Sequence, residues 1–197
     1  VPVNGGWHDA GDLSQGVPNT ADATYYLFRI ARAYGARNPE LAKRIVQEGL
    51  WGLSWIMKTR LPDGYRCRWS VMDFWTDGIA GTQDDIITEA VNSPYANLLA
   101  AIAGSRAAQV LGADDPARAD RCLREAREDW LFAVKGLGTH QGYPHGIVMS
   151  SLCVTAALEL FLATGNREYA DVAVEHAQDI LRCQETEPRE WTIPLCG

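Results

Sequence analysis

Apolar side chains recur along this chain every three or four positions, which is the spacing of one face of an α-helix. The first such stretch starts at Asn19, which we expect to be the N-cap, and stops at Gly35. The second follows Pro39 and keeps the same spacing as far as the turn at 62–64. A glycine and a few polar residues join the two stretches, so the pattern predicts a helical hairpin.

Two more pairs of helical stretches follow, 94–112 with 116–133 and 148–163 with 169–183. In each pair the first stretch is apolar on nearly all sides, whereas the second has one apolar stripe and a polar face. We therefore expect the first helix to be buried on both sides and the second to be half exposed, which gives two layers. Repeated pairs of this kind build either an open solenoid or a closed α/α toroid. No strand pattern longer than a few residues appears, so we expect an all-α fold.

The connections between helices are of two kinds. Short turns, each made of a glycine and a few polar residues, join the two helices of a pair. Longer stretches rich in glycine and aromatic residues precede the first pair and separate the pairs, at 1–18, 60–93 and 136–147. Because the two kinds of connection must lie at opposite ends of the helices, we expect any functional site at the end with the long loops.

Composition narrows the function classes. The 197 residues are 47% hydrophobic, which is ample for a packed core. With 18 basic and 25 acidic residues the formal net charge is -7, so we expect neither a nucleic acid nor a membrane surface as partner. The apolar stretch 148–163 is interrupted by polar residues, so we expect it to be too short and too polar to span a membrane. The first residue is Val1, which suggests a processed or excised piece.

Some side chains fall on the apolar stripes, and we expect them to be buried. His176 is predicted to be a hydrogen-bonded core histidine, and the alternating charges of 118–129 to lie on a solvated helix face. Packing roles are expected for three tryptophans and three cysteines: Trp51, Trp55, Trp130, Cys122, Cys153 and Cys183. The five cysteines include no CxxC pair, so neither a zinc ribbon nor a complete disulfide framework is predicted.

The densest chemical signal is the string GGWHDAGD, from Gly5 to Asp12. Its glycines allow tight turns around two carboxylates, Asp9 and Asp12, just before the first helix. Two carboxylates in a rigid loop can share one water, because one side chain orients it while the other accepts its proton. The alternative is a loop whose aspartates only form turns and cap the helix.

The string GGWHDAGD resembles the base motif of glycoside hydrolase family 9, the cellulase-type inverting glycosidases. The helical stretches follow in the order of that family, and the resemblance covers essentially the whole chain. It implies a partial catalytic domain over 1–197, folded as about half of an (α/α)6 barrel, and hydrolysis of a β-glycosidic bond of a cellulose-like glucan with inversion.

Carried over by motif position, the resemblance makes Asp12 the general base and Asp9 the residue that holds the water. The family's general acid is a glutamate near the C-terminus of the barrel, beyond the end of this chain. Residues 1–197 alone are therefore expected to be inactive and to need the other half of the barrel. The resemblance also implies a secreted or periplasmic protein.

Other residues at the long-loop end are candidates for sugar contacts, with burial against the barrel rim as the alternative. The substrate-binding candidates are Trp7, His8, Trp75, His140, Tyr143 and His145. No cofactor is expected. The family's calcium site uses a Ser-Asp-Glu string, and the matching positions here are Ser150, Ser151 and Leu152, so that site is not predicted.

Two other classes of function remain open at this point. One is a non-catalytic carbohydrate-binding or scaffold protein derived from the same barrel, in which Asp9 and Asp12 persist only as loop structure. The other is an unrelated helical-repeat interaction module, which would present a concave surface without clustered carboxylates.

Overall fold

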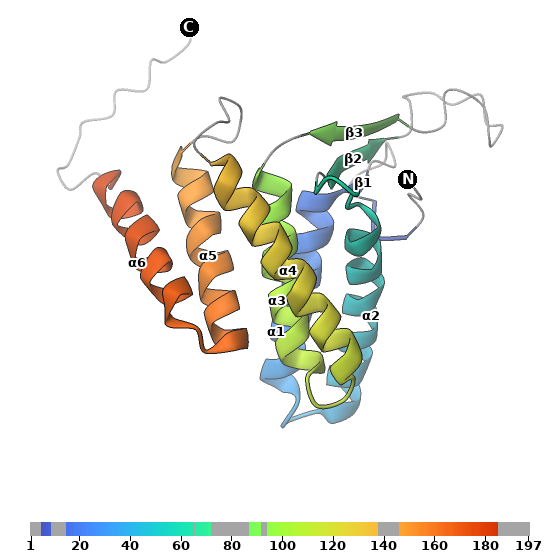
Figure 1. The fold of residues 1–197 in the computed structure, drawn as a ribbon. Helices are drawn as coiled ribbons and strands as arrows, with labels where there is room; N and C mark the ends of the chain where they lie inside the picture. The colour runs from blue at the N-terminus through green and yellow to red at the C-terminus, as the bar shows by residue number, and fades with distance from the viewer. Residues whose placement is uncertain are drawn as a thin grey trace, which may run out of the picture.

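A computed structural model describes residues 5–8, 15–64, 66–71, 87–91, 94–137 and 146–184. These residues hold six helices and three short strands (Figure 1). The helices are α1 (Val17–Tyr34), α2 (Pro39–Lys58), α3 (Pro94–Leu111), α4 (Pro116–Gly136), α5 (Gly146–Thr164) and α6 (Arg167–Arg182). The strands are β1 (Gln15–Gly16), β2 (Arg66–Val71) and β3 (Ile87–Val91).

The helices form two rows. Helix α3 packs against both α1 and α5, and these three form the inner row. Helices α2, α4 and α6 pack mainly against α1, α3 and α5, respectively, and form the outer row (Figure 1). The predicted all-α architecture of helical hairpins in two layers, half of an (α/α)6 barrel, is confirmed.

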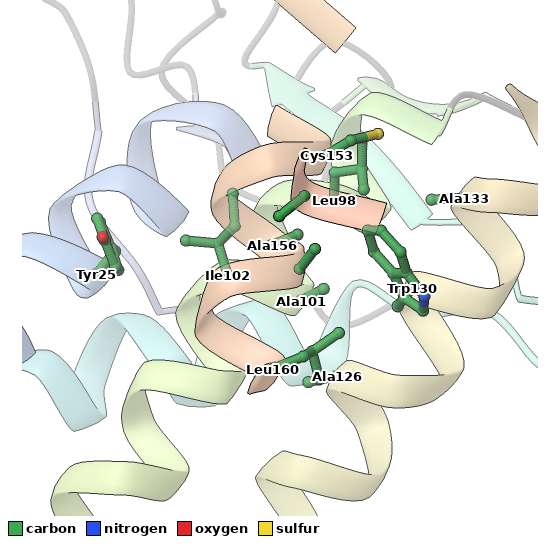
Figure 2. Packing of buried hydrophobic residues seen from close by; sticks show 12 residues of the cluster. Tyr25, Leu98, Ala101, Ile102, Ala126, Trp130, Ala133, Cys153, Ala156 and Leu160 are labelled. Atoms are coloured by element: carbon green, nitrogen blue, oxygen red, sulfur yellow. The ribbon is translucent and has the colours of Figure 1, made fainter. Parts of the chain in front are cut away.

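The core lies around α3, which has neighbours on three sides. Almost every residue of this helix is buried, and many are alanines that let the helices approach closely. Leu98 and Ile102 of α3 belong to one buried cluster with Trp130 of α4 and Leu160 of α5 (Figure 2). The prediction that the first helix of a pair is buried on both sides is therefore confirmed for α3.

The three short turns lie together at one end of the helices (Figure 1). Each of the following helices starts at a polar residue whose side chain accepts a backbone hydrogen bond: Asn38 before α2, Asp115 before α4 and Asn166 before α6. The prediction of Asn19 as the first N-cap is wrong. Helix α1 starts at Val17 because Pro18 suits the first helical turn, and its N-cap is Gly16, three residues before Asn19.

A three-stranded antiparallel sheet, in the order β1-β2-β3, covers the opposite end. The expectation that no strand pattern is longer than a few residues is wrong for β2, which has six residues, and for β3, which has five. The register of β2 against β3 shifts between Cys67 and Trp69, which interrupts the two-residue alternation by which a strand is detected in sequence.

Helix α5 is 19 residues long. Among the described helices it is the one that, by length and composition, is long enough and apolar enough to cross a membrane. The expectation that this stretch is too short is therefore wrong, although an inner helix of a helical barrel passes the same test. One charge in it is buried and paired. Glu159 accepts hydrogen bonds from Arg106 of α3 (2.5 Å) and Tyr25 of α1 (3.1 Å), so α5 packs as part of the inner row.

The two ends of the inner row expose apolar side chains. In α1 these include Tyr26, Ile30 and Tyr34, and in α5 they include Leu158 and Leu162. An inner helix that is apolar on most sides needs a neighbour on each side, and among the described helices α1 and α5 each have α3 alone as an inner neighbour. Each end of the row is thus an open edge.

The packing predictions for single residues have mixed outcomes. Trp55, Trp130, Cys122 and Cys153 are buried, as expected. The burial prediction for Trp51 is wrong, because this residue is 54% exposed.

Two further burial predictions fail on α6, where Ala173 is the one buried residue. Cys183 is exposed at its C-terminal end. His176 is half-buried, and its Nδ1 lies 3.6 Å from Asp179 without a hydrogen bond. Both misses have one cause: α6 packs mainly on α5, so its stripe of apolar residues is only partly covered.

Candidate active-site loop

Two of the predicted site residues, Trp7 and His8, lie in the described part of the motif, at the sheet end of the helices. The other six lie outside the described residues: Asp9, Asp12, Trp75, His140, Tyr143 and His145. The structure therefore defines the two stems of the motif loop, 5–8 before the aspartates and 15–16 after them.

The first stem rests on the last turns of α2. Gly5 and Gly6 have φ angles of 106° and 70°, a region that side chains rarely adopt. A Cβ atom at Gly6 would lie 3.0 Å from the indole ring of Trp55, which is buried. Both glycines are therefore required by the backbone conformation, and Gly6 also by its close approach to Trp55.

Trp7 is fixed at both ends of its indole. Its Nε1 donates a hydrogen bond to Glu48 of α2 at 2.9 Å. The Cζ3–Cη2 edge of its six-membered ring lies against Gly52, where a Cβ atom would overlap both this ring and the hydroxyl of Thr24. Gly52 thus creates a notch in α2 that receives Trp7. His8, the next residue, is exposed.

A second indole holds the same stem. The Nε1 of Trp51 donates a hydrogen bond to the carbonyl oxygen of Gly6 at 2.8 Å. The sequence predicted only packing for Trp51. The available signal was the spacing of Glu48, Trp51, Gly52 and Trp55, which places all four on one stripe of α2 near its C-terminal end.

The second stem is tied to the first stem and to the sheet. The side-chain amide of Gln15 donates a hydrogen bond to the carbonyl oxygen of Gly5. The strand Gln15–Gly16 pairs with Ser70 and Trp69 of β2. The ring of Trp69 lies so close to Gly16 that a Cβ atom there would be 2.7 Å from it. The ring of Trp69 therefore packs against the backbone of β1.

Strand β2 is itself anchored by a buried ion pair that the sequence did not reveal. The guanidinium of Arg66 binds both carboxylate oxygens of Asp129 on α4, and its Nη1 donates to the carbonyl oxygen of Ile56 at 2.5 Å and to Thr59 at 3.0 Å. Asn97 donates a further bond to Asp129 at 2.7 Å. Asp129 is therefore buried, which corrects the expectation that the whole charged run 118–129 is solvated.

No group of three or more His, Cys, Asp or Glu side chains within the described ranges is arranged to hold a metal ion. The described part of the site positions the motif loop. It consists of two stems, fixed against α2 and β2, that bracket the six residues 9–14 containing Asp9 and Asp12.

Two rows of paired helices, with a glycine-rich carboxylate loop at the sheet end, define this chain as part of an α/α toroid. A model of Glycosyl hydrolase family 9 matches residues 1–193, and the chain belongs to that family. No match was found among curated proteins.

Solved structures of this family are similar to the chain. A metagenome-derived glycoside hydrolase family 9 endoglucanase has a TM-score of 0.71 and 25% identity, covering 88% of this chain and 35% of its own. The endoglucanase of the termite Nasutitermes takasagoensis has a TM-score of 0.73 and 17% identity, and the match covers 98% of this chain and 47% of the termite protein. Endoglucanase CelQ from Clostridium thermocellum, complexed with cellotetraose, has a TM-score of 0.68 and 19% identity, and the match covers 88% of this chain and 30% of CelQ. The chain thus spans less than half the length of these proteins.

Proposed function

We propose that this chain supplies the base-bearing half of an inverting β-glycoside hydrolase. The observation that carries the proposal is the pair of fixed stems around the family motif, at the end of the helices opposite the short turns. Membership of Glycosyl hydrolase family 9 supports the reaction class. The endoglucanase neighbours, one of them holding cellotetraose, support a cellulose-like β-glucan as substrate.

In the proposed mechanism, Asp12 accepts a proton from a water that Asp9 orients. The water oxygen attacks the anomeric carbon on the face opposite the glycosidic oxygen, so the configuration at that carbon inverts. As the C–O bond breaks, the glycosidic oxygen takes a proton from a carboxylic acid about 6.5 to 9.5 Å from the base. That acid belongs to the part of the family barrel that this chain does not include.

The remaining candidates are proposed to contact the sugar chain on either side of the bond that is cleaved. They are His8, Trp75, His140, Tyr143 and His145, with Trp7 bordering the loop. Secretion or a periplasmic location stays a prediction of the family resemblance.

The test requires a protein that carries this chain together with the remaining helices of the family barrel, called the complete-barrel protein below. In it, Asp12→Asn is expected to lower kcat on a β-glucan by about 10²- to 10⁴-fold, the usual contribution of a general base. Asp9→Asn is expected to lower kcat as well. The matched control is Asp120→Asn, on the exposed face of α4, which should leave kcat unchanged.

Full activity of the Asp12→Asn variant would contradict the assignment of the base. A complete-barrel protein that binds β-glucan without any turnover would instead favour the second candidate function, a carbohydrate-binding protein in which both aspartates are only structural.

A further inference from the structure

We propose that Trp7 acts in catalysis by holding the carboxylate loop, together with Glu48 and Trp51 of α2, and does not bind sugar. These three residues are called the loop clamp. The inference rests on the proposed function, because it assigns a role relative to Asp9 and Asp12. It makes the three side chains positioning residues, which act through the aspartates and not on the substrate.

The hydrogen bonds of the clamp point toward the loop from one helix. Glu48 accepts from Trp7 at 2.9 Å, and Trp51 donates to the Gly6 carbonyl at 2.8 Å, so two successive residues of the stem are held by side chains one helical turn apart. Asp9 follows two residues after Trp7, counting through His8. A shift of the stem would therefore also displace Asp9, because His8 alone separates Asp9 from Trp7.

The stem is also held by shape. The indole of Trp7 fills the notch at Gly52, and Gly6 packs against the ring of Trp55. A ring whose edge lies against a helix backbone and whose N–H is already bonded has little freedom to adjust to a sugar. The geometry of Trp7 suits a fixed anchor.

A hydrogen bond joins the two stems to each other. Because Gln15 donates to the carbonyl oxygen of Gly5, the residues before and after 9–14 are joined directly. The second stem continues into β1 and α1 without a break. With both ends of six residues held, a change in either stem alters where the aspartates can lie. A misplacement of about 1 Å can lower the rate of an enzymatic step by 10²-fold.

The experiment compares three variants of the complete-barrel protein. Trp7→Phe and Trp51→Phe keep an aromatic ring but remove the N–H donor, and Glu48→Ala removes the acceptor. We expect each to lower kcat by about 10- to 100-fold with KM within about twofold of the parent, since the aspartates are displaced while the sugar contacts remain. Glu48→Gln keeps an oxygen acceptor and is expected to restore most of kcat.

The matched control is Trp130→Phe, the same chemical change in the core between α4 and α5. It should lower the melting temperature and leave kcat unchanged. If the clamp has a purely structural role, all three clamp variants will also show a lower melting temperature and an unchanged kcat. That result would overturn the inference. An increase in KM at constant kcat for Trp7→Phe would also overturn it, because that result marks a sugar contact.

Asp12→Asn in the same assay separates the two proposals. If Asp12→Asn loses turnover while the clamp variants keep full kcat, the clamp is refuted and the proposed function stands. If Asp12→Asn keeps full turnover, the proposed function fails, and the positioning role of the clamp fails with it.

Discussion

Removing the carboxylate of Asp129 should destabilise the protein more than removing any exposed charge of α4. In the structure, Asp129 accepts two hydrogen bonds from Arg66 and one from Asn97, and its side chain is 1% exposed. Asp129→Ala leaves the guanidinium of Arg66 buried at a relative exposure of 2%, with neutral oxygens of Ile56 and Thr59 as its remaining partners.

The expected cost follows from the chemistry of buried ion pairs. Breaking such a pair by removing one partner costs about 3–5 kcal/mol, because the other charge stays buried without compensation. Loss of the bond from Asn97 adds to this cost, since its amide is left with the carbonyl oxygen of Gly64 at 3.1 Å. We therefore predict a decrease of about 3–5 kcal/mol in the free energy of unfolding for Asp129→Ala.

The assay is urea unfolding of the complete-barrel protein, followed by far-ultraviolet circular dichroism and fitted with a constant m-value. The matched control is Glu128→Ala, the adjacent residue, whose carboxylate pairs with Arg60 at a side-chain exposure of 47%. This exposed pair should contribute about 0–1 kcal/mol. Replacing both partners, by Arg66→Met with Asp129→Leu, should recover most of the loss.

If Asp129→Ala cost no more than Glu128→Ala, the reasoning would be refuted, because Arg66 would then have found another partner or water. If the double replacement were as unstable as Asp129→Ala, the loss would come from the shape of the site and not from an uncompensated charge.

Three further predictions concern the cysteines and the open edges. Under native conditions iodoacetamide should label Cys183 rapidly and Cys122 and Cys153 hardly at all, as mapped by peptide mass spectrometry; equal labelling would contradict their burial. Burial raises the pKa of Cys122 to about 11 and that of Cys153 to about 12, from 9.0. Each folded thiol therefore keeps its proton above pH 9 while the unfolded one loses it, and stability should fall with rising pH by about 1.4 kcal/mol per pH unit for each thiol. This fall ends near each folded pKa. Alanine at either position should reduce the alkaline slope in urea unfolding. Expressed alone, residues 1–197 should self-associate through their apolar edges, and Leu158→Glu with Leu162→Glu should reduce the association seen by sedimentation velocity. A monodisperse, cooperatively melting parent would count against half a toroid.

The pattern of apolar residues was sufficient to predict the helices and their pairing because helical periodicity and turn residues are local. The assignment of helices to the inner or the outer row followed from a second pattern. Inner helices were expected to be apolar on most sides, and outer helices to have a single apolar stripe. The start of α1 was missed at Asn19, since Pro18 and Gly16 set the helix start instead. Strand β2 was missed because its register shift breaks the alternation.

The site was predicted to a lesser extent, for a physical reason. The motif Gly5–Asp12 is local and identifies the loop, but the side chains that hold it come from far along the chain. Glu48 is 41 positions from Trp7, and Asp129 is 63 positions from Arg66. Periodicity places Trp51 and Asp129 on a helix face without indicating which other segment packs against that face.

The configuration of the first product tests the central claim most directly. A complete-barrel protein is supplied with a β-glucan oligosaccharide, and proton NMR spectra are recorded before the released sugar mutarotates. If a water activated by Asp12 attacks the anomeric carbon, the new reducing end appears first as the α-anomer. A new reducing end that appears first as the β-anomer would indicate retention, and the role proposed here for Asp9 and Asp12 would be wrong.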